Sequence, residues 1–177
     1  MKFYQQNRMK KGLIAYFSRK GNNYWGGKIV NLEVGNTEVV AKMIQEMTGF
    51  DLFEIKTVKT YSLDYVESTM VAQQELHDYV RPELSVSVED MSSYEVIYLG
   101  YPNWWGTMPM AVWTFLESYD FTGKTIVPFC THEGSGMGSS ERDIKRLCPL
   151  ANVEKGLAIR GSSARGSKET LKKWIKI

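Results

Sequence analysis

The feature that most constrains the fold is an alternation of two hydrophobic patterns along the chain. Apolar runs of strand length occupy residues 13–17, 50–55, 96–99, 125–130 and 156–159. Segments with apolar residues at helical spacing lie around residues 39–47, 65–80, 112–116, 144–147 and 168–177. Alternating strands and helices predict a parallel sheet with right-handed crossovers. We therefore expect an α/β three-layer sandwich, a five-stranded parallel sheet with helices on both faces.

One connection, residues 19–35, is longer than a typical link between a strand and a helix. Val30, Leu32 and Val34 alternate with polar residues, and Gly26-Gly27 can form a tight turn upstream of them. This pattern predicts an inserted β-hairpin over the end of the first strand. The sequence has no internal repeat or long linker, so its 177 residues predict one domain, residues 1–177.

Several residues indicate where the elements begin and end. Thr107 is expected to be a helix N-cap, with Pro109 in the first turn, where its missing N–H costs nothing. Ser140-x-x-Asp143 is typical of another helix start. Two further residues, Gly49 and Gly123, are expected to end helices or to turn the chain into the next strand.

Pro128 disturbs the otherwise regular pattern. It lies inside the apolar run at residues 125–130, where it removes one hydrogen bond from a sheet ladder. Proline in a central strand is typical of a bulge. We therefore expect an irregular strand at this position.

Composition excludes several classes of protein. The net charge of +2 is too small for a strongly basic nucleic-acid binder. Residues 1–11 contain no apolar signal-peptide core, and no run approaches the roughly 18 apolar residues of a membrane span. Cys130 and Cys148 lack the spacing of a metal site or a dithiol switch, so they are expected to be buried. These observations predict a reduced cytoplasmic protein without a metal site.

The candidate site lies where the strands end, because open α/β sheets bind ligands outside the carboxyl ends of their strands. After the first strand come Ser18 and Arg19, and then Gly35, Asn36 and Thr37 at the start of a helix. Hydroxyl and amide groups beside a helix N-terminus suit a phosphate. The alternative is that Asn36 or Thr37 only caps the helix.

The second loop, residues 102–106, is the tryptophan loop. It reads Pro102-Asn103-Trp104-Trp105-Gly106. Two adjacent tryptophans among turn-forming residues predict that at least one indole is exposed, where it can stack on a flat ring. The alternative is that either indole packs into the core. Backbone groups near Asn103 and Gly106 can form hydrogen bonds with the edge of a heterocycle.

The third loop, residues 131–136, is the glycine loop. It contains Thr131, His132, Glu133, Gly134 and Gly136. Glycines let the backbone approach a ring closely and present N–H groups to negative charge. The glycine pattern is a weak motif by itself, but the three loops follow strands that one parallel sheet would bring together.

These loops resemble those of bacterial short-chain flavodoxins. The resemblance extends from Gly12 to Trp174, and it depends on four stretches: Tyr16-Phe17-Ser18-Arg19, Gly35-Asn36-Thr37-Glu38, residues 99–106 and residues 128–136. It implies the strand order 2-1-3-4-5 and FMN bound without a covalent bond. It places the phosphate at Ser18, Asn36 and Thr37, and the isoalloxazine ring between the tryptophan loop and the glycine loop.

The resemblance also implies a function, which is low-potential electron transfer between redox partner proteins by a monomer or weak dimer. A peptide near residues 104–106 would then accept a hydrogen bond from the N5–H of reduced flavin. The glycine loop has no aromatic residue, and only His132 could cover the second face of the ring. An open face would suit an NAD(P)H:quinone reductase, which is the alternative. A binding module without redox activity is the second alternative.

Overall fold

Six parallel strands form the central sheet of the computed structural model, which describes residues 10–175. They are β1 (Gly12–Tyr16), β4 (Asp51–Glu54), β5 (Val96–Pro102), β6 (Thr125–His132), β7 (Asn152–Val153) and β8 (Leu157–Arg160). The order across the sheet is β4-β1-β5-β6, and both β7 and β8 then pair with β6. The predicted order 2-1-3-4-5 is confirmed, with the fifth position shared by two short strands.

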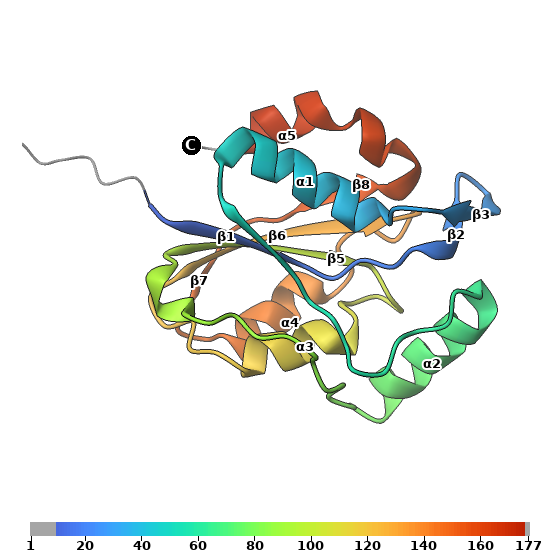
Figure 1. Ribbon diagram of the computed structural model, residues 1–177, viewed down its shortest axis with the longest axis horizontal. Coiled ribbons are helices and arrows are strands. Elements are labelled where there is room, and N and C mark those ends of the chain that lie inside the picture. Colours follow the sequence, from blue (N-terminus) through green and yellow to red (C-terminus); the bar gives the residue numbers. More distant parts are fainter. Residues whose placement is uncertain (1–9, 176–177) are drawn as a thin grey trace, which may run out of the picture.

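Helices cover both faces of this sheet, as predicted (Figure 1). On one face lie α1 (Asn36–Thr48), the 3-10 segment η2 (Gly161–Gly166) and α5 (Lys168–Trp174). On the other face lie α3 (Met110–Glu117) and α4 (Ser140–Leu147), and the 3-10 turn η1 (Met91–Ser93) precedes β5. The three-layer α/β sandwich is confirmed. Within the described residues, no helix is both long and apolar enough to cross a bilayer.

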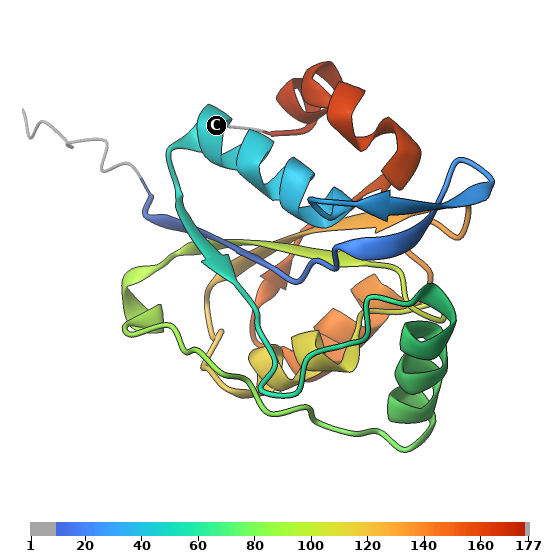
Figure 2. The same ribbon diagram turned by 45° about the vertical axis from the view of Figure 1, so that its right-hand side comes forward.

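Helix α2 (Tyr65–His77) lies on neither face of the sheet. Figure 2 shows it beside the end of the sheet, below the hairpin formed by β2 (Gly21–Trp25) and β3 (Lys28–Leu32). Its only buried residues are Ser68 and Ala72, so it has too little apolar surface to cover a sheet. The helix predicted over residues 65–80 is shorter in the structure. The helix predicted over residues 168–177 ends at Trp174, and residues 176 and 177 lie outside the described part.

The hairpin predicted within residues 19–35 consists of β2 (Gly21–Trp25) and β3 (Lys28–Leu32), which pair antiparallel. Gly26 and Gly27 connect them with φ values of 60° and 92°. Positive φ at both central residues is typical of a two-residue hairpin turn. The hairpin is joined to the segment before α2, because the N–H of Asn22 donates to the carbonyl of Leu63 at 2.9 Å.

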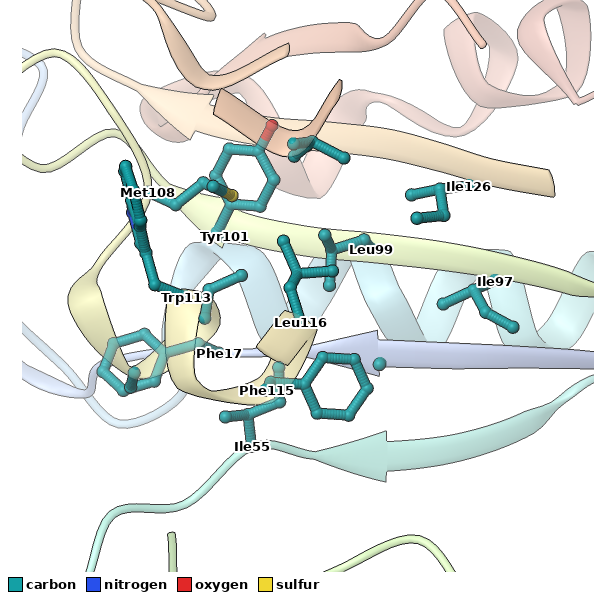
Figure 3. Packing of buried hydrophobic residues seen from close by; sticks show 14 of the residues in the cluster. Phe17, Ile55, Ile97, Leu99, Tyr101, Met108, Trp113, Phe115, Leu116 and Ile126 are labelled. Atoms are coloured by element: carbon teal, nitrogen blue, oxygen red, sulfur yellow. The ribbon is translucent and has the colours of Figure 1, made fainter. Parts of the chain in front are cut away.

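The larger core cluster fills the space between the sheet and helices α3 and α4. Figure 3 shows Ile97 and Leu99 of β5 with Phe115 and Leu116 of α3 in this cluster. A second cluster on the opposite face includes Phe129 of β6, packed beneath α1. Gly100 has to be a glycine, since a Cβ there would collide with the Phe129 ring.

The predicted bulge at Pro128 is wrong. Strand β6 pairs with β5 in unbroken register through this residue. The carbonyl of Ile126 accepts from the N–H of Glu154, so it faces the fifth strand position, and Pro128 two residues later faces the same side. The missing N–H therefore falls in the gap between β7 and β8.

Two predicted helix starts need correction and two glycine predictions are confirmed. Pro109 is the N-cap of α3, and Thr107 instead donates its hydroxyl to the Asp143 carboxylate. Helix α4 begins at Ser140, as predicted, but Ser139 occupies the N-cap position. The two glycines, Gly49 and Gly123, turn the chain with φ values of 68° and 73°.

Candidate functional site

A cleft of about 760 Å³ opens at the carboxyl ends of the strands. Its size is typical of a small-molecule or cofactor site. The three predicted loops all contribute to its wall. The predicted residues that line it are Arg19, Asn36, Pro102, Asn103, Trp104, Trp105, Gly106, Thr131, His132, Glu133 and Gly134. The other predicted site residues are not part of the cleft lining; they are Ser18, Gly35, Thr37 and Gly136.

The N-terminus of α1 forms one end of the cleft. Gly35 is the N-cap residue of α1, and as a glycine it has no side chain that could cap the helix. Ser18, in the loop that follows β1, supplies a cap, because its Oγ accepts from the N–H of Glu38 at 3.1 Å. Within residues 10–175, the N–H groups of Asn36 and Thr37 have no acceptor. Two backbone donors and the Ser18 hydroxyl proton are thus available to an anion.

The alternative that Asn36 or Thr37 merely caps α1 is wrong. The Asn36 Oδ1 accepts from Arg165 at 3.2 Å. Thr37 is buried, and its Oγ1 lies 2.8 Å from the Oγ1 of Thr131. Thr37 therefore connects the first loop to the start of the third.

Arg19 contacts the protein backbone with its guanidinium. It donates to the carbonyls of Asn22, Ser62 and Asp64. Burial lowers the pKa of this guanidinium, and the Asp64 carboxylate partly opposes that effect. Arg19 therefore joins the root of the hairpin to the start of α2, and its N–H groups are largely used by carbonyls.

The tryptophan loop forms a tight turn that ends at Thr107. Trp104 and Thr107 form two backbone hydrogen bonds with each other, at 2.9 and 3.3 Å. The two residues between them, Trp105 and Gly106, have φ values of 56° and 85°. Asn103 supports the turn on both sides, since its Oδ1 accepts from the N–H of Gly106 and its Nδ2 donates to Gly136. The turn is therefore held in one conformation before any ligand binds.

The two indoles have different environments. Trp104 is half-buried and makes edge-to-face contacts with Phe17 and Tyr61, with ring centroids 5.2 and 5.1 Å apart. Trp105 is 51% exposed, which confirms that one indole is exposed. Its Nε1 donates to the carbonyl of Thr69 in α2 at 2.9 Å. Trp105 thereby connects the tryptophan loop to α2.

Within the glycine loop, His132 and the two glycines set the local conformation. The backbone N–H of Gly134 donates a hydrogen bond to the Nδ1 of His132 at 2.8 Å. This bond requires the neutral ring, because Nδ1 must be unprotonated to accept it. Burial lowers the pKa of His132, the nearby Arg160 lowers it further, and Glu133 opposes both effects. Gly134 and Gly136 have φ values of 139° and 63°, conformations that suit glycine.

Glu133 lines the cleft, but its carboxylate has structural partners. Oε1 accepts from the N–H of Ser162 at 2.7 Å, and Oε2 accepts from the N–H of Gly26 at 3.4 Å. Arg160 lies 3.7 Å from Oε2. This nearly buried carboxylate joins the tip of the hairpin to η2, so its partners are protein groups of the cleft wall.

Sequence reasoning missed the residues that α2 and η2 contribute to the cleft. The missed lining residues are Tyr65, Ser68, Thr69 and Ala72 of α2 and Gly161 of η2, together with Asn23 and Tyr24 of the hairpin. Gly161 could have been found, because it begins a glycine- and serine-rich segment after the last strand, at the same edge as the other loops. Ser68 and Ala72, four residues apart, are small residues on one helix face and gave a weaker signal.

Both cysteines are buried, as predicted. Burial is the main cause that raises the pKa of Cys148 to about 11, and it also raises the pKa of Cys130. Neither thiol is therefore a thiolate at neutral pH, and neither lines the cleft.

Comparison with known proteins identifies relatives of this chain. A family model described as flavodoxin matches residues 11–177. Flavodoxin 1 of Escherichia coli strain K12 is 27% identical over 139 residues, which is 76% of this chain and 61% of that protein. The chain thus spans less than two thirds of the length of this curated relative.

Solved structures provide a second comparison. A candidate flavoprotein from Bacteroides uniformis is 30% identical, with a TM-score of 0.72 over 92% of this chain and 98% of the other. One from Bacteroides eggerthii is 28% identical, with a TM-score of 0.71 over 94% and 99%. A Lactobacillus acidophilus flavoprotein, solved in complex with FMN, has the same fold at 23% identity, with a TM-score of 0.64 over 94% and 99%.

Proposed function

Because the chain belongs to the flavodoxin family, we propose that it binds FMN without a covalent bond and transfers electrons at low potential between partner proteins. The observation that carries this proposal is a pair of N–H groups, at Asn36 and Thr37, that have no acceptor among the described residues and lie at a cleft that both indoles line. A backbone anion site joined to an aromatic wall fits a phosphate ester that bears a flat ring.

The residues at the phosphate end would bind and orient FMN. Asn36 and Thr37 offer backbone N–H groups at the positive end of α1, and Ser18 offers its hydroxyl proton. A Cβ at Gly35 would collide with the Ser18 hydroxyl, so glycine is needed for Ser18 and the helix to come together. None of these groups carries a full positive charge. The guanidinium of Arg165 supplies one nearby, because it donates a hydrogen bond to the Oδ1 of Asn36.

The residues at the ring end would exclude water and hold a proton. FMN supplies one- and two-electron chemistry when bound. Among the described residues, the carbonyl of Trp105 has no donor, whereas that of Gly106 accepts from Ser139. We assign to Trp105 the carbonyl that accepts a hydrogen bond from the N5–H of the reduced ring.

A reductase is the second candidate, because one side of the cleft is open. Gly134 and Ser135 are exposed, and His132 is the nearest side chain of the glycine loop that could cover a ring. An accessible ring face would admit a nicotinamide or a quinone. For an electron carrier, the exposed apolar side chains at the rim, Trp105, Val66 and Met70, would instead contact the partner protein.

The first experiment measures binding. The apoprotein is titrated with FMN and with riboflavin, and flavin fluorescence is recorded. We expect one FMN per chain and weaker binding of riboflavin, which lacks the phosphate. Ser18→Ala should weaken FMN binding roughly tenfold, the equivalent of one charge-assisted hydrogen bond, and leave riboflavin binding nearly unchanged.

Ser163→Ala is the matched control, since Ser163 is an exposed serine of η2. Equal affinity for FMN and riboflavin would contradict the phosphate site. If neither FMN nor riboflavin binds, the result favours a binding module without redox activity.

The second experiment separates the two redox functions. Anaerobic reduction of the FMN-loaded protein in steps should give two separate one-electron stages for a carrier. A reductase should oxidise NADH or NADPH rapidly when a quinone is the acceptor. Rapid turnover with a single two-electron stage would replace the carrier proposal with the reductase.

A further inference from the structure

A buried carboxylate lies behind the tryptophan loop, outside the residues that line the cleft. Asp143 of α4 is only 6% exposed. Its Oδ2 accepts from the Thr107 hydroxyl at 2.7 Å and from the Ser139 hydroxyl at 2.8 Å. Both donors belong to the segments that hold the Trp104–Thr107 turn. A buried carboxylate with such short bonds needs a structural or functional reason.

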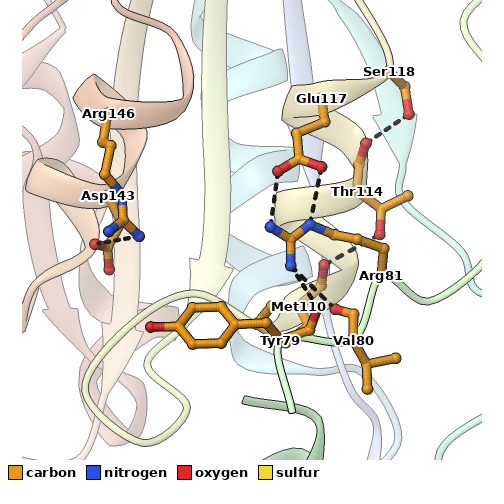
Figure 4. A network of polar contacts seen from close by, with 9 residues as sticks. All are labelled: Tyr79, Val80, Arg81, Met110, Thr114, Glu117, Ser118, Asp143 and Arg146. Carbon is orange, nitrogen blue, oxygen red and sulfur yellow. Dashed lines mark hydrogen bonds and ion pairs between the residues drawn. The ribbon is translucent and has the colours of Figure 1, made fainter. Parts of the chain in front are cut away.

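The Asp143 carboxylate accepts hydrogen bonds from the hydroxyl groups of Thr107 and Ser139. The nearest cation is Arg146, whose Nη2 lies 3.7 Å from Oδ1 (Figure 4). Arg146 is 60% exposed and also lies over the Trp113 ring, so it neutralises the carboxylate incompletely.

Asp143 acts on the turn through Ser139. The backbone N–H of Ser139 donates to the carbonyl of Gly106 at 2.7 Å. The Ser139 hydroxyl lies 3.2 Å from the same carbonyl, but it has one proton, and the shorter charge-assisted bond to Asp143 takes it. The carboxylate therefore fixes the donors on both sides of the turn, Thr107 after it and Ser139 behind it.

We propose that Asp143 is a positioning residue for the turn that faces the flavin, and that its charge lowers the reduction potential of the bound flavin. The proposal rests on the proposed function. Reduction brings negative charge to the ring, and a fixed negative charge behind the turn opposes that step. The hydrogen bonds from Thr107 and Ser139 hold this charge in place in a dry environment, where it is screened poorly.

Asp143→Asn tests the charge, since asparagine keeps an acceptor oxygen and the shape of the side chain. The potential of the bound flavin is measured by spectroelectrochemistry after FMN affinity has been determined. We expect the equilibrium to shift towards reduced flavin by up to tenfold, equivalent to about 59 mV for a one-electron step. Glu46→Gln, a neutralised exposed carboxylate on α1, is the control and should shift it less than twofold.

Arg146→Gln provides a second test that does not disturb the buried hydroxyls. It leaves Asp143 less neutralised, so the potential should fall, in the direction opposite to Asp143→Asn. Unchanged potentials in both variants would overturn the proposal. If Asp143→Asn does not fold, an unchanged potential in Arg146→Gln alone overturns it.

The positioning role is tested without flavin. In the apoprotein, Asp143→Ala should accelerate hydrogen exchange at the amide of Thr107 at least tenfold, whereas Asp143→Asn should accelerate it less. Equal protection in all three proteins would overturn the positioning role. Failure of the wild-type protein to bind FMN would instead refute the proposed function, so the two failures are distinguishable.

Discussion

The tryptophan loop and the glycine loop line the same cleft but are held in different ways. Hydrogen bonds to other segments hold the tryptophan loop: the backbone N–H of Ser139 donates to the carbonyl of Gly106, and the Trp105 indole donates to the carbonyl of Thr69 in α2. The glycine loop depends on positive φ at its glycines, on the ring of its own His132 and on the contacts of Glu133 with the hairpin and η2. Gly134 and Ser135 at its tip are exposed.

This difference separates a preorganised wall from an adaptable one. The turn at Trp105 and Gly106 has its conformation before binding, so ordering it adds no cost when a ligand arrives. In the glycine loop, only the exposed tip at Gly134 and Ser135 is free to adjust to the ligand, because Thr131 and Glu133 contact other segments. We therefore expect a substitution that pushes the tryptophan-loop turn apart to change stability most, and substitutions at the exposed tip of the glycine loop to change it least.

The largest effect is expected at Gly138, where the chain after the glycine loop touches the tryptophan loop. A Cβ there would collide with the carbonyl of Gly106, whereas one at Gly136 would meet no atom within 4 Å. Both glycines have positive φ, 54° and 63°. Gly138→Ala should lower the free energy of unfolding by about 3 kcal/mol, and Gly136→Ala by about 1 kcal/mol. Urea denaturation measures both, and equal losses would remove the difference between the loops.

A smaller loss is expected at the buried start of the glycine loop. Thr37→Val leaves the Thr131 hydroxyl without its partner, so it should cost about 2 kcal/mol. Thr131→Val should cost a similar amount. The double variant should lose less than the sum of the two, because it leaves neither hydroxyl unpaired. Additive losses would indicate that the two hydroxyls do not interact.

Trp105→Phe tests the connection between the tryptophan loop and α2. It removes the hydrogen bond to Thr69 and keeps most of the aromatic surface. The expected loss in unfolding free energy is about 1 kcal/mol. Amide exchange in α2 should increase near Thr69. An unchanged exchange rate there would show that the indole does not hold α2.

The smallest effect concerns the pH dependence from His132. Its pKa in the folded protein is below the ordinary value of 6.5, mainly because of burial, so the unfolded chain binds the proton more readily. The stabilising contribution is complete above pH 6.5 and is lost as the pH falls through the folded-state value. His132→Gln should reduce the slope of stability against pH in that window. A steeper slope in the variant would contradict the assignment.

Most of the fold could be predicted from the sequence because local patterns specify it. Strand and helix periodicity located the sheet and its layers, and Gly26-Gly27 located the hairpin. The position of α2 could not be predicted, since a helix with few buried residues has no preferred surface in the sequence alone. Pro128 fits a regular strand because its missing N–H faces the gap between β7 and β8. That gap depends on tertiary packing, so the sequence pattern could not reveal it.

The loops that form the candidate site could be predicted from the sequence, whereas the hydrogen-bond partners of their side chains could not. The three loops were located because open α/β sheets bind ligands at the carboxyl ends of their strands. The structure brings these loops to one cleft. The partners of Glu133 and Thr107 depended on residues far away in the chain, Ser162 and Asp143. Such pairings are set by tertiary packing, so a residue pattern cannot reveal them. The assignment of individual residues to FMN stays a prediction.

The gap opposite Pro128 has a consequence for the edge of the sheet. Edge strands present unpaired N–H and C=O groups on which another chain can add a strand, and long regular edges favour aggregation. Here the edge is formed by β7 and β8, of two and four residues, with the charged Lys155 between them. No uninterrupted template longer than β8 is offered on that side, so the break between β7 and β8, opposite Pro128, disfavours the addition of a strand at this edge.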